Sequence, residues 1–570
     1  MTARLQGLAN WYAIWRARRA RPATGFASQQ QPRSIGLFAR GRQLLAGNYL
    51  LAGHLVEAPG ISLWDAPTEN PAFWEAAHGF LWLDDLAAVG DPVARARAQD
   101  WTWDWIDRYG KGHSTLWRPE LTGRRLIRWI NHAVMLMNGR GPDDNIAYFR
   151  ALTAQAAFLS RRWQIAAPGL PRFEALAGLI YAGLALKGQE HLTENAITSL
   201  THECESEIDE EGGIPTRNPE ELLEVFTLLI WVAQALNEAK RPVPQPIRTA
   251  IERAAPSLRA LRHSDGGLAR FHGGGRGQEG RLDHALATSG IKTLPGAGSA
   301  MGFLRMAAGR TTIIVDAAQP PDGRAGTSAH ASTLAFEMSS GRRPVIVSCG
   351  NGTPFGPDWQ RAGRATASHS TLSIEGYSSS RLDHGTPGIL ADRADVTSIR
   401  PSRTPEGQVL QLVQNGWRKT HGLQHTRLLL LSPDGRHIGG QDELLAQNAE
   451  DQERLVRMRA RSAEGLLRFA LRFHLHPEVD AEIDMGGTAI SLALRSGEIW
   501  VMRHDQSDGL SIQPSVYLER GRRGPRATKQ IVISGQMTEF EARIGWTLAK
   551  AQDTPQTIRD LEREDPPIVF

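Results

Sequence analysis

The spacing of apolar residues changes once along the chain, and this change constrains the fold more than any other feature. Before about residue 290, apolar residues recur every three to four positions, as in Phe173, Leu176, Ala177, Ile180 and Leu184. That period is typical of amphipathic helices that pack against one another. From about residue 300 the period becomes two, in short segments rich in β-branched residues. We therefore expect a helical half followed by a half built of β-strands.

The first half predicts successive helices joined by short breakers. Segments 139–142 and 168–171 contain glycine and proline, and they are short enough to make consecutive helices antiparallel neighbours. Such hairpins close into a ring or stay an open solenoid. The glycine-rich segment 266–280 lies where the period changes, and we interpret it as the linker. The expected helices are 72–87, 93–109, 122–137, 145–163, 173–186, 190–207, 219–238 and 244–262.

The second half predicts many short strands with no helices between them. This pattern is typical of stacked antiparallel sheets. We place a helical domain over residues 1–295 and a β-sandwich over residues 296–570. The strands that carry the pattern are 311–315, 344–347, 371–374, 409–413, 427–431, 468–475, 499–502 and 530–533.

Composition excludes several classes of protein. The 65 Lys and Arg are nearly balanced by 61 Asp and Glu, so the chain lacks the concentrated basic stripe of a bulk nucleic-acid binder. Two cysteines make no disulfide framework. The longest apolar run, 225–236, is interrupted by Thr227 and Gln234 and is too short to span a bilayer. We expect a soluble protein.

The start of the chain bears on where the protein works. Its first apolar stretch, 8–15, precedes four arginines at 16, 18, 19 and 21, whereas a secretory signal has its positive charges first. We therefore expect a cytoplasmic protein or one at the inner membrane surface. The arginines form either the solvated face of a first helix or a contact with anionic lipid.

Three consecutive segments carry a resemblance to a known family. They are GTSAHASTLAFEMSSG (326–341), VIVSCG (345–350) and WQRAGRATASHSTLSIEG (359–376). Their order resembles that of the heparinase II/III family of polysaccharide lyases. Segments 125–133 and 172–186 resemble the helical toroid of the same family. The resemblance implies an (α/α) toroid followed by an antiparallel β-sandwich. It also implies an acidic polysaccharide or oligosaccharide as partner, and its often exported members suggest the cell envelope or periplasm as an alternative location.

The family activity is β-elimination at a uronic acid, which requires a group that neutralises the carboxylate and groups that move protons. The family's Asn-His pair falls on Leu170 and Pro171, its Tyr on Glu221, and its first catalytic His on Ser328. The resemblance also implies a zinc-type site of two His and one Asp. His330 and His369 match the histidines, but Ser348 stands at the Asp position, so a structural zinc ion would have an incomplete set of ligands.

The remaining candidates follow from this comparison. We assign Glu221, Arg217, Arg364 and His330 as candidate catalytic residues, and Arg172, Arg361 and Trp359 as candidate substrate contacts, because a guanidinium pairs bidentately with a carboxylate. His330 and His369 are the candidate metal ligands. These residues also have structural alternatives. The histidines could form hydrogen bonds with backbone groups, and the arginines could form ion pairs. Glu221 could stabilise the N-terminus of a helix that begins at Pro219.

Three functions fit this pattern. The first is a lyase in which these residues have taken over the β-elimination of uronic-acid glycans. The second is a glycan-binding or scaffolding protein that has lost catalysis. The third is an enzyme of another class, since a fold does not fix a function.

Overall fold

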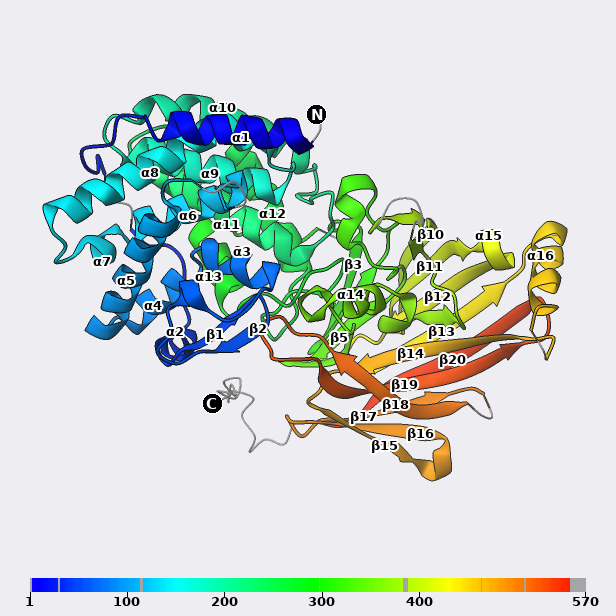
Figure 1. Ribbon diagram of the computed structural model, residues 1–570. Helices are drawn as coiled ribbons and strands as arrows, with labels where there is room; N and C mark the ends of the chain where they lie inside the picture. The colour runs from blue at the N-terminus through cyan, green and yellow to red at the C-terminus, as the bar shows by residue number, and fades with distance from the viewer. Residues whose placement is uncertain are drawn as a thin grey trace.

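The computed structural model describes residues 3–28, 31–112, 116–296, 298–382, 388–462, 464–506 and 509–553. A helical domain and a β-sandwich lie side by side (Figure 1). This confirms the expected fold class, an (α/α) toroid followed by an antiparallel β-sandwich. None of the helices in the described ranges combines the length and the apolar character that crossing a bilayer needs.

Several helices of the first domain begin where the sequence supplies proline or a capping side chain. Pro219 opens one helix, and the Asn218 side chain accepts hydrogen bonds from the backbone amides of Glu220 and Glu221. The helices are α1 (Ala3–Ala17), α2 (Phe38–Leu45), α3 (Pro71–His78), α4 (Trp82–Val89), α5 (Pro92–Tyr109), α6 (Pro119–Asn131), α7 (Ala133–Met137), α8 (Pro142–Arg162), α9 (Leu170–Ala185), α10 (Thr193–Glu207), α11 (Pro219–Glu238), α12 (Gln245–Ala260) and α13 (Arg281–Ser289).

Helices α6 and α9 cross at two glycines. A Cβ added to Gly178 would lie 2.4 Å from the Cα of Gly123, and one added to Gly123 would lie 2.1 Å from the carbonyl oxygen of Glu174. No side chain fits at either position, so the crossing depends on glycine.

The first domain is not exclusively helical, which corrects the expectation. Strands β1 (Asn48–Leu51) and β2 (His54–Glu57) form an antiparallel hairpin between α2 and α3. Its turn places Ala52 and Gly53 at φ angles of 50° and 85°, the left-handed region that tight hairpin turns require. Two of the expected helices are also each divided in two, 72–87 into α3 and α4 and 122–137 into α6 and α7.

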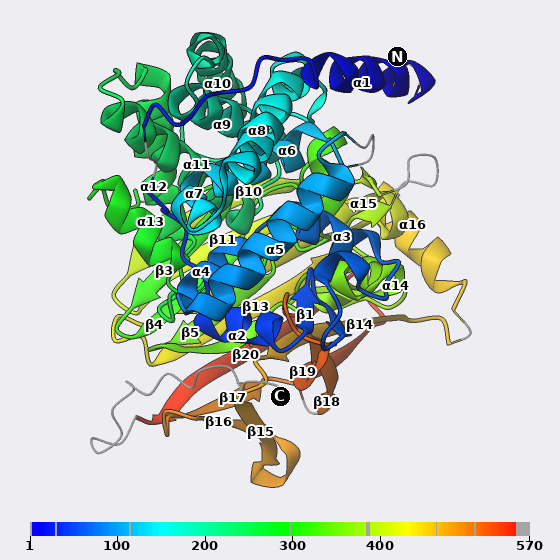
Figure 2. The same ribbon diagram turned by 60° about the vertical axis from the view of Figure 1, so that its left-hand side comes forward.

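The second domain stacks two antiparallel sheets (Figure 2). One has the order β10-β11-β12-β13-β20-β17-β16-β15; the other has the order β18-β19-β14-β6-β5-β4-β3, with β7 also paired to β14. The rings of Phe336 and Trp546, from opposite sheets, stack 5.9 Å apart in the core. The strands of these two sheets are β3 (Phe303–Ala308), β4 (Thr311–Asp316), β5 (Phe336–Ser340), β6 (Arg343–Val347), β7 (Leu372–Ile374), β10 (Val396–Thr404), β11 (Gly407–Trp417), β12 (Leu423–Leu431), β13 (His437–Leu445), β14 (Leu467–Leu475), β15 (Val479–Asp484), β16 (Ala489–Leu494), β17 (Ile499–His504), β18 (Leu510–Tyr517), β19 (Arg526–Met537) and β20 (Glu541–Gln552). Strands β8 (Arg381–Leu382) and β9 (Leu390–Asp392) form a separate two-stranded sheet.

The glycine-rich segment 266–280 is not a free linker, so that interpretation was wrong. Arg270 in this segment is buried and donates hydrogen bonds to the carbonyl oxygens of Ser348, Cys349 and Leu518. His272 is fully buried beside the sandwich. The glycines let the backbone pass close to the second domain, and the segment forms part of the interface. Helix α13 follows it before the sandwich begins.

Candidate functional site

Three buried histidines meet where the sandwich contacts the toroid. The rings of His330 and His369 lie 5.1 Å apart, and those of His272 and His330 lie 6.3 Å apart. His330 and His369 are adjacent, as the sequence predicts. His272 was not among the predicted site residues, because it lies in the segment interpreted as a linker.

Hydrogen bonds define part of this cluster. His272 Nδ1 accepts the backbone N–H of His330 at 3.2 Å, so its neutral ring carries the proton on Nε2, 3.4 Å from the Asp316 carboxylate. His369 Nδ1 lies 3.1 Å from the Ser348 hydroxyl. Within the described residues, His330 Nδ1 and His369 Nε2 have no hydrogen-bond partner.

Burial sets the charge of these rings. It lowers the pKa of His369 to about 3 and the pKa of His330 well below its ordinary value, with neighbouring histidines adding to the effect. Both imidazoles are therefore neutral near pH 7, the form that binds metals. However, the described residues contain no group of three His, Cys, Asp or Glu placed to hold a metal ion. Two imidazoles do not complete a zinc site, so we assign no step to a metal.

Arg217, a candidate catalytic residue, is not free to contact a substrate. Its guanidinium is buried and donates to Asp316 Oδ1 at 2.5 Å and to the carbonyl oxygens of Met301 and Gln319 at 2.7 and 2.8 Å. Burial would raise the pKa of Asp316, but Arg217 and His272 reverse this and hold it well below its usual range. Arg217 therefore joins the toroid to strand β4, and its donors are already occupied.

Arg364, another candidate catalytic residue, is also buried. It donates to the carbonyl oxygens of Ala329, Gly326 and Gly388 at 2.7, 3.2 and 2.8 Å. These bonds hold the loop that carries His330. These bonds engage Nε and Nη2 of the guanidinium, and the role of Arg364 as a catalytic residue stays a prediction.

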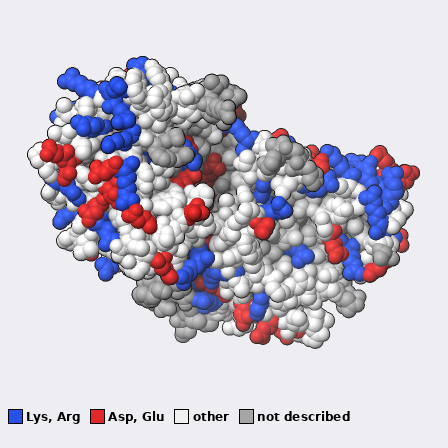
Figure 3. Space-filling model, in the orientation of Figure 1, with Lys and Arg blue, Asp and Glu red and all other residues white. Residues whose placement is uncertain are grey.

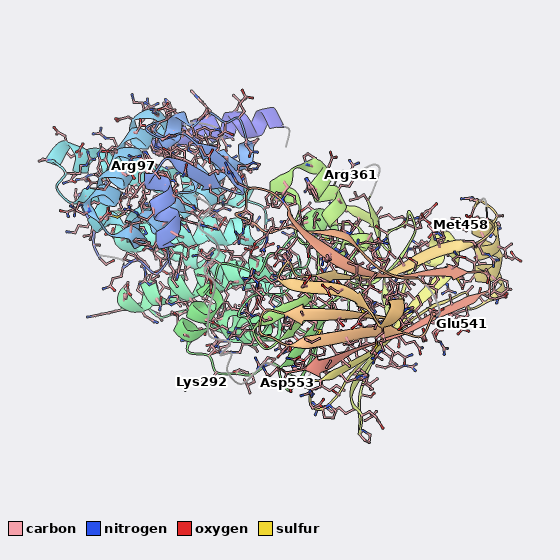
Figure 4. All side chains as sticks on the ribbon, turned by 90° about the horizontal axis from the view of Figure 1, so that it is seen from below. Arg97, Lys292, Arg361, Met458, Glu541 and Asp553 are labelled. Atoms are coloured by element: carbon pink, nitrogen blue, oxygen red, sulfur yellow. The ribbon has the colours of Figure 1, made fainter. Side chains whose placement is uncertain are left out.

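The other predicted contacts lie on α14 (Pro357–Gly363) and at the start of α9. Trp359 is half-buried, whereas Arg361 is exposed on the outside of the molecule (Figure 4). Arg172 donates to Glu203 at 3.1 Å and to the carbonyl oxygen of Ala166 at 3.1 Å. Their roles as substrate contacts stay predictions.

The start of α9 lies among carboxylates. A Cβ on Gly169 would lie 3.8 Å from Glu207 Oε2 and 3.9 Å from Glu221 Oε1, and the Gly169 amide donates to Glu203 at 2.8 Å. Burial, together with the charges of Glu174 and Glu207, raises the pKa of Glu221. Figure 3 shows acidic side chains in the hollow between the domains. We call Glu174, Glu203, Glu207 and Glu221 the acidic cluster.

Arginines neutralise three of these four carboxylates. Arg124 pairs with Glu174 at 2.6 Å, Arg172 with Glu203 at 3.1 Å, and Arg324 with Glu207 at 2.6 Å. Among the described residues, no arginine or lysine forms an ion pair with Glu221. The arginines that reach the acidic cluster are therefore already paired with carboxylates, whereas a uronate-binding site needs positive charge that is not paired.

Comparison with known proteins agrees with this architecture. Residues 291–547 match the family model "Heparinase II/III-like, C-terminal". The chain is 31% identical over 549 residues to FtsZ-localized protein C of Caulobacter vibrioides (strain NA1000 / CB15N), covering 93% of this chain and 91% of that protein. The chain therefore belongs to the heparinase II/III family.

Two solved structures show the same fold at low identity. Heparinase III matches with a TM-score of 0.69 and 13% identity, over 95% of this chain and 89% of that one. A mutant of the heparan sulfate lyase HepC from Pedobacter heparinus matches with a TM-score of 0.58 and 14% identity, over 96% and 88%. At this identity the likeness concerns the fold alone, and the chemistry must be judged from the residues in the cleft.

Proposed function

We propose that this chain is a non-catalytic heparinase II/III-like protein that acts as a scaffold associated with FtsZ. The observation that carries the proposal is which residues stand at the positions of the family's catalytic groups. Leu170 and Pro171 lack a group that neutralises a uronate, and Ser328 lacks the basicity to move a proton. Glu221 adds a negative charge beside them.

β-Elimination requires the substrate carboxylate to be neutralised before the weakly acidic proton beside it leaves. The Arg217 guanidinium donates to Asp316 and to backbone carbonyl groups, and Arg364 donates from Nε and Nη2 to backbone carbonyl groups. The neutral histidines His330 and His369 are fully enclosed, with exposed fractions of 2% and 0%. None of these groups supports acid-base chemistry on a polysaccharide.

The association with FtsZ is supported by the relative. FtsZ-localized protein C aligns with this chain over nearly its whole length, across both domains. Because the alignment spans both domains, it supports a shared role for the whole chain rather than for one domain alone.

Imaging tests the association. A fluorescent fusion of the full chain is expressed in its host together with labelled FtsZ, and the fraction of fusion signal coincident with FtsZ is measured. We expect coincidence, and dispersal of the fusion when FtsZ is depleted. A fusion that stays uniform, or keeps its position without FtsZ, would contradict this part of the proposal. The loss of catalysis is tested separately with purified protein.

A further inference from the structure

A cavity of about 430 Å³ lies where the two domains join. Its walls come from the C-terminal end of α12 and the residues after it, from α13, from the segment between α13 and β3, and from β3 itself. These elements carry neither the His272, His330 and His369 rings nor the acidic cluster. Small organic ligands occupy cavities of this size, so the volume is sufficient for such a molecule.

Arginine dominates the charge of this cavity. Arg259, Arg262 and Arg305 line it together with one carboxylate, Asp283. Asp283 pairs with Arg262 at 2.9 Å. Among the described residues, neither Arg259 nor Arg305 forms an ion pair with an Asp or Glu. Two of the three positive charges therefore have no negative charge beside them.

The hydrogen-bond partners of these two arginines are neutral. Arg305 donates to the carbonyl oxygens of Ala260 and Arg262 at 3.1 and 2.6 Å, and Arg259 donates to that of Thr293 at 2.8 Å. These bonds hold the end of α12 and the segment before β3 in place. A carbonyl oxygen carries no net charge, so the cavity stays positive. Consistent with this, burial and the nearby charge of Arg262 both lower the pKa of Arg305.

Arg262 also has a donor without a partner. Its Nη2 reaches Asp283, but within the described ranges its Nε is buried and makes no hydrogen bond. A buried donor that has lost its contact with water is unfavourable unless another group accepts its proton. An oxygen atom of a ligand in the cavity is the acceptor that we assign to it.

The remaining wall is apolar. Leu286 on α13 and Leu294 and Pro295 in the following segment line the cavity. Leu294 is 77% exposed, and Lys292, two residues earlier, lies on the surface near the junction of the domains (Figure 4). Ligand cavities typically combine an apolar wall with a few polar groups that orient the ligand. This cavity therefore suits an anion that carries an organic group.

We propose that this cavity binds a small phosphomonoester with an apolar or aromatic organic group. A phosphomonoester carries a charge between about −1.5 and −2 at pH 7, which balances the unpaired charges of Arg259 and Arg305. A single carboxylate would leave one of them unbalanced. The guanidinium group also matches phosphate in geometry, because it donates two parallel hydrogen bonds. The proposal does not depend on the association with FtsZ.

Isothermal titration calorimetry of the full chain tests the ligand class. We expect adenosine monophosphate or phenyl phosphate to bind with a Kd below about 1 mM. Inorganic phosphate should bind at least about tenfold more weakly, since it lacks the organic group, and adenosine should not bind, since it lacks the charge. Failure of both phosphomonoesters to bind would overturn the proposal. So would binding of adenosine or of inorganic phosphate with the same affinity as adenosine monophosphate.

Two variants separate ligand binding from a structural role, because they break the same ion pair and change the charge of the cavity in opposite directions. Arg262→Gln removes a positive charge and should weaken binding of the phosphomonoester by about tenfold or more. Asp283→Asn removes the negative charge and should strengthen binding by about threefold. Weaker binding in both variants would overturn the proposal, since the pair would then act only by holding the local structure.

The matched control for Arg262→Gln is Arg108→Gln on α5. The side chains of Arg108 and Asp65 are 36% and 51% exposed, and those of Arg262 and Asp283 are 34% and 51% exposed. The control loses an ion pair of the same exposure elsewhere on the toroid and should leave binding unchanged. An equal loss of affinity in the control would contradict the proposal. Circular dichroism confirms that each variant is folded, as expected for exposed ion pairs.

Discussion

Replacing Asp316 with Asn tests whether the ion pair with Arg217 holds the two domains together. Asp316 is fully buried, and it accepts hydrogen bonds from Arg217 at 2.5 Å and from the Ser332 hydroxyl at 2.7 Å. Removing one partner of a buried pair costs about 3–5 kcal/mol, because the other charge stays buried. Arg217 keeps its carbonyl acceptors at Met301 and Gln319, so we expect the lower end, about 3 kcal/mol.

Urea unfolding followed by circular dichroism measures this loss. The matched control is Asp65→Asn, which breaks a pair with Arg108 whose side chains are 51% and 36% exposed. The control should lose at most about 1 kcal/mol. Equal unfolding midpoints for Asp316→Asn and the unchanged protein would refute the reasoning.

The same pair predicts a pH dependence. Since the folded state holds the pKa of Asp316 well below its usual range, its stabilisation is complete above the unfolded pKa of about 3.9. It is lost as the pH falls through the lower folded pKa. The difference between the unchanged protein and Asp316→Asn should therefore be constant from about pH 5 to pH 7 and shrink in stronger acid. A difference that grows in acid would contradict the assignment.

Three further predictions concern the helix crossing, the acidic cluster and the histidines. Gly178→Ala should lower the free energy of unfolding in urea by about 1–3 kcal/mol, because its Cβ would lie 2.4 Å from the Cα of Gly123. The control, Gly141→Ala, should have little effect, because a Cβ at that position meets nothing within 4 Å. Glu221→Gln should raise the free energy of unfolding at pH 7, because the raised pKa of Glu221 means that its ionised form destabilises the folded state. This gain should shrink as the pH falls towards about 4. A lower free energy of unfolding at pH 7 would contradict the prediction. Elemental analysis should find less than one zinc per chain, and a chelator should leave the unfolding midpoint unchanged. One tightly bound zinc ion per chain would contradict this, because His330 and His369 would then share the metal with a further ligand outside the groups found among the described residues.

The change of hydrophobic period predicted the two-domain architecture. The expectation of no helices between the strands was wrong, because α14, α15 (Arg418–His421) and α16 (Ala449–Arg459) lie between them. Helix 219–238 was predicted with the bounds it has, because Asn218 and Pro219 mark its start in the sequence itself. The hairpin Asn48–Glu57 was missed because it is short and depends on the local backbone angles of Ala52 and Gly53. Short strands leave little periodic signal.

The candidate site was less predictable. The motif placed His330 beside His369, since both positions follow from the order of the strands. The burial of Arg217 and Arg364 depends on carbonyl groups that lie far away in the sequence. Arg217, for example, donates to the carbonyl oxygen of Gln319. No local pattern shows which arginines will be buried in this way. His272 was overlooked for the same reason, because its partners come from the other domain.

The absence of lyase chemistry is the central claim, and a turnover assay tests it most directly. Purified protein is incubated with a panel of uronic-acid glycans, and the far-ultraviolet absorbance of the unsaturated elimination product is followed, with an active heparinase as positive control. We expect no increase above the protein-free reaction. A steady increase that disappears in Glu221→Gln or His330→Ala would contradict the account, because it would show that these residues carry out β-elimination.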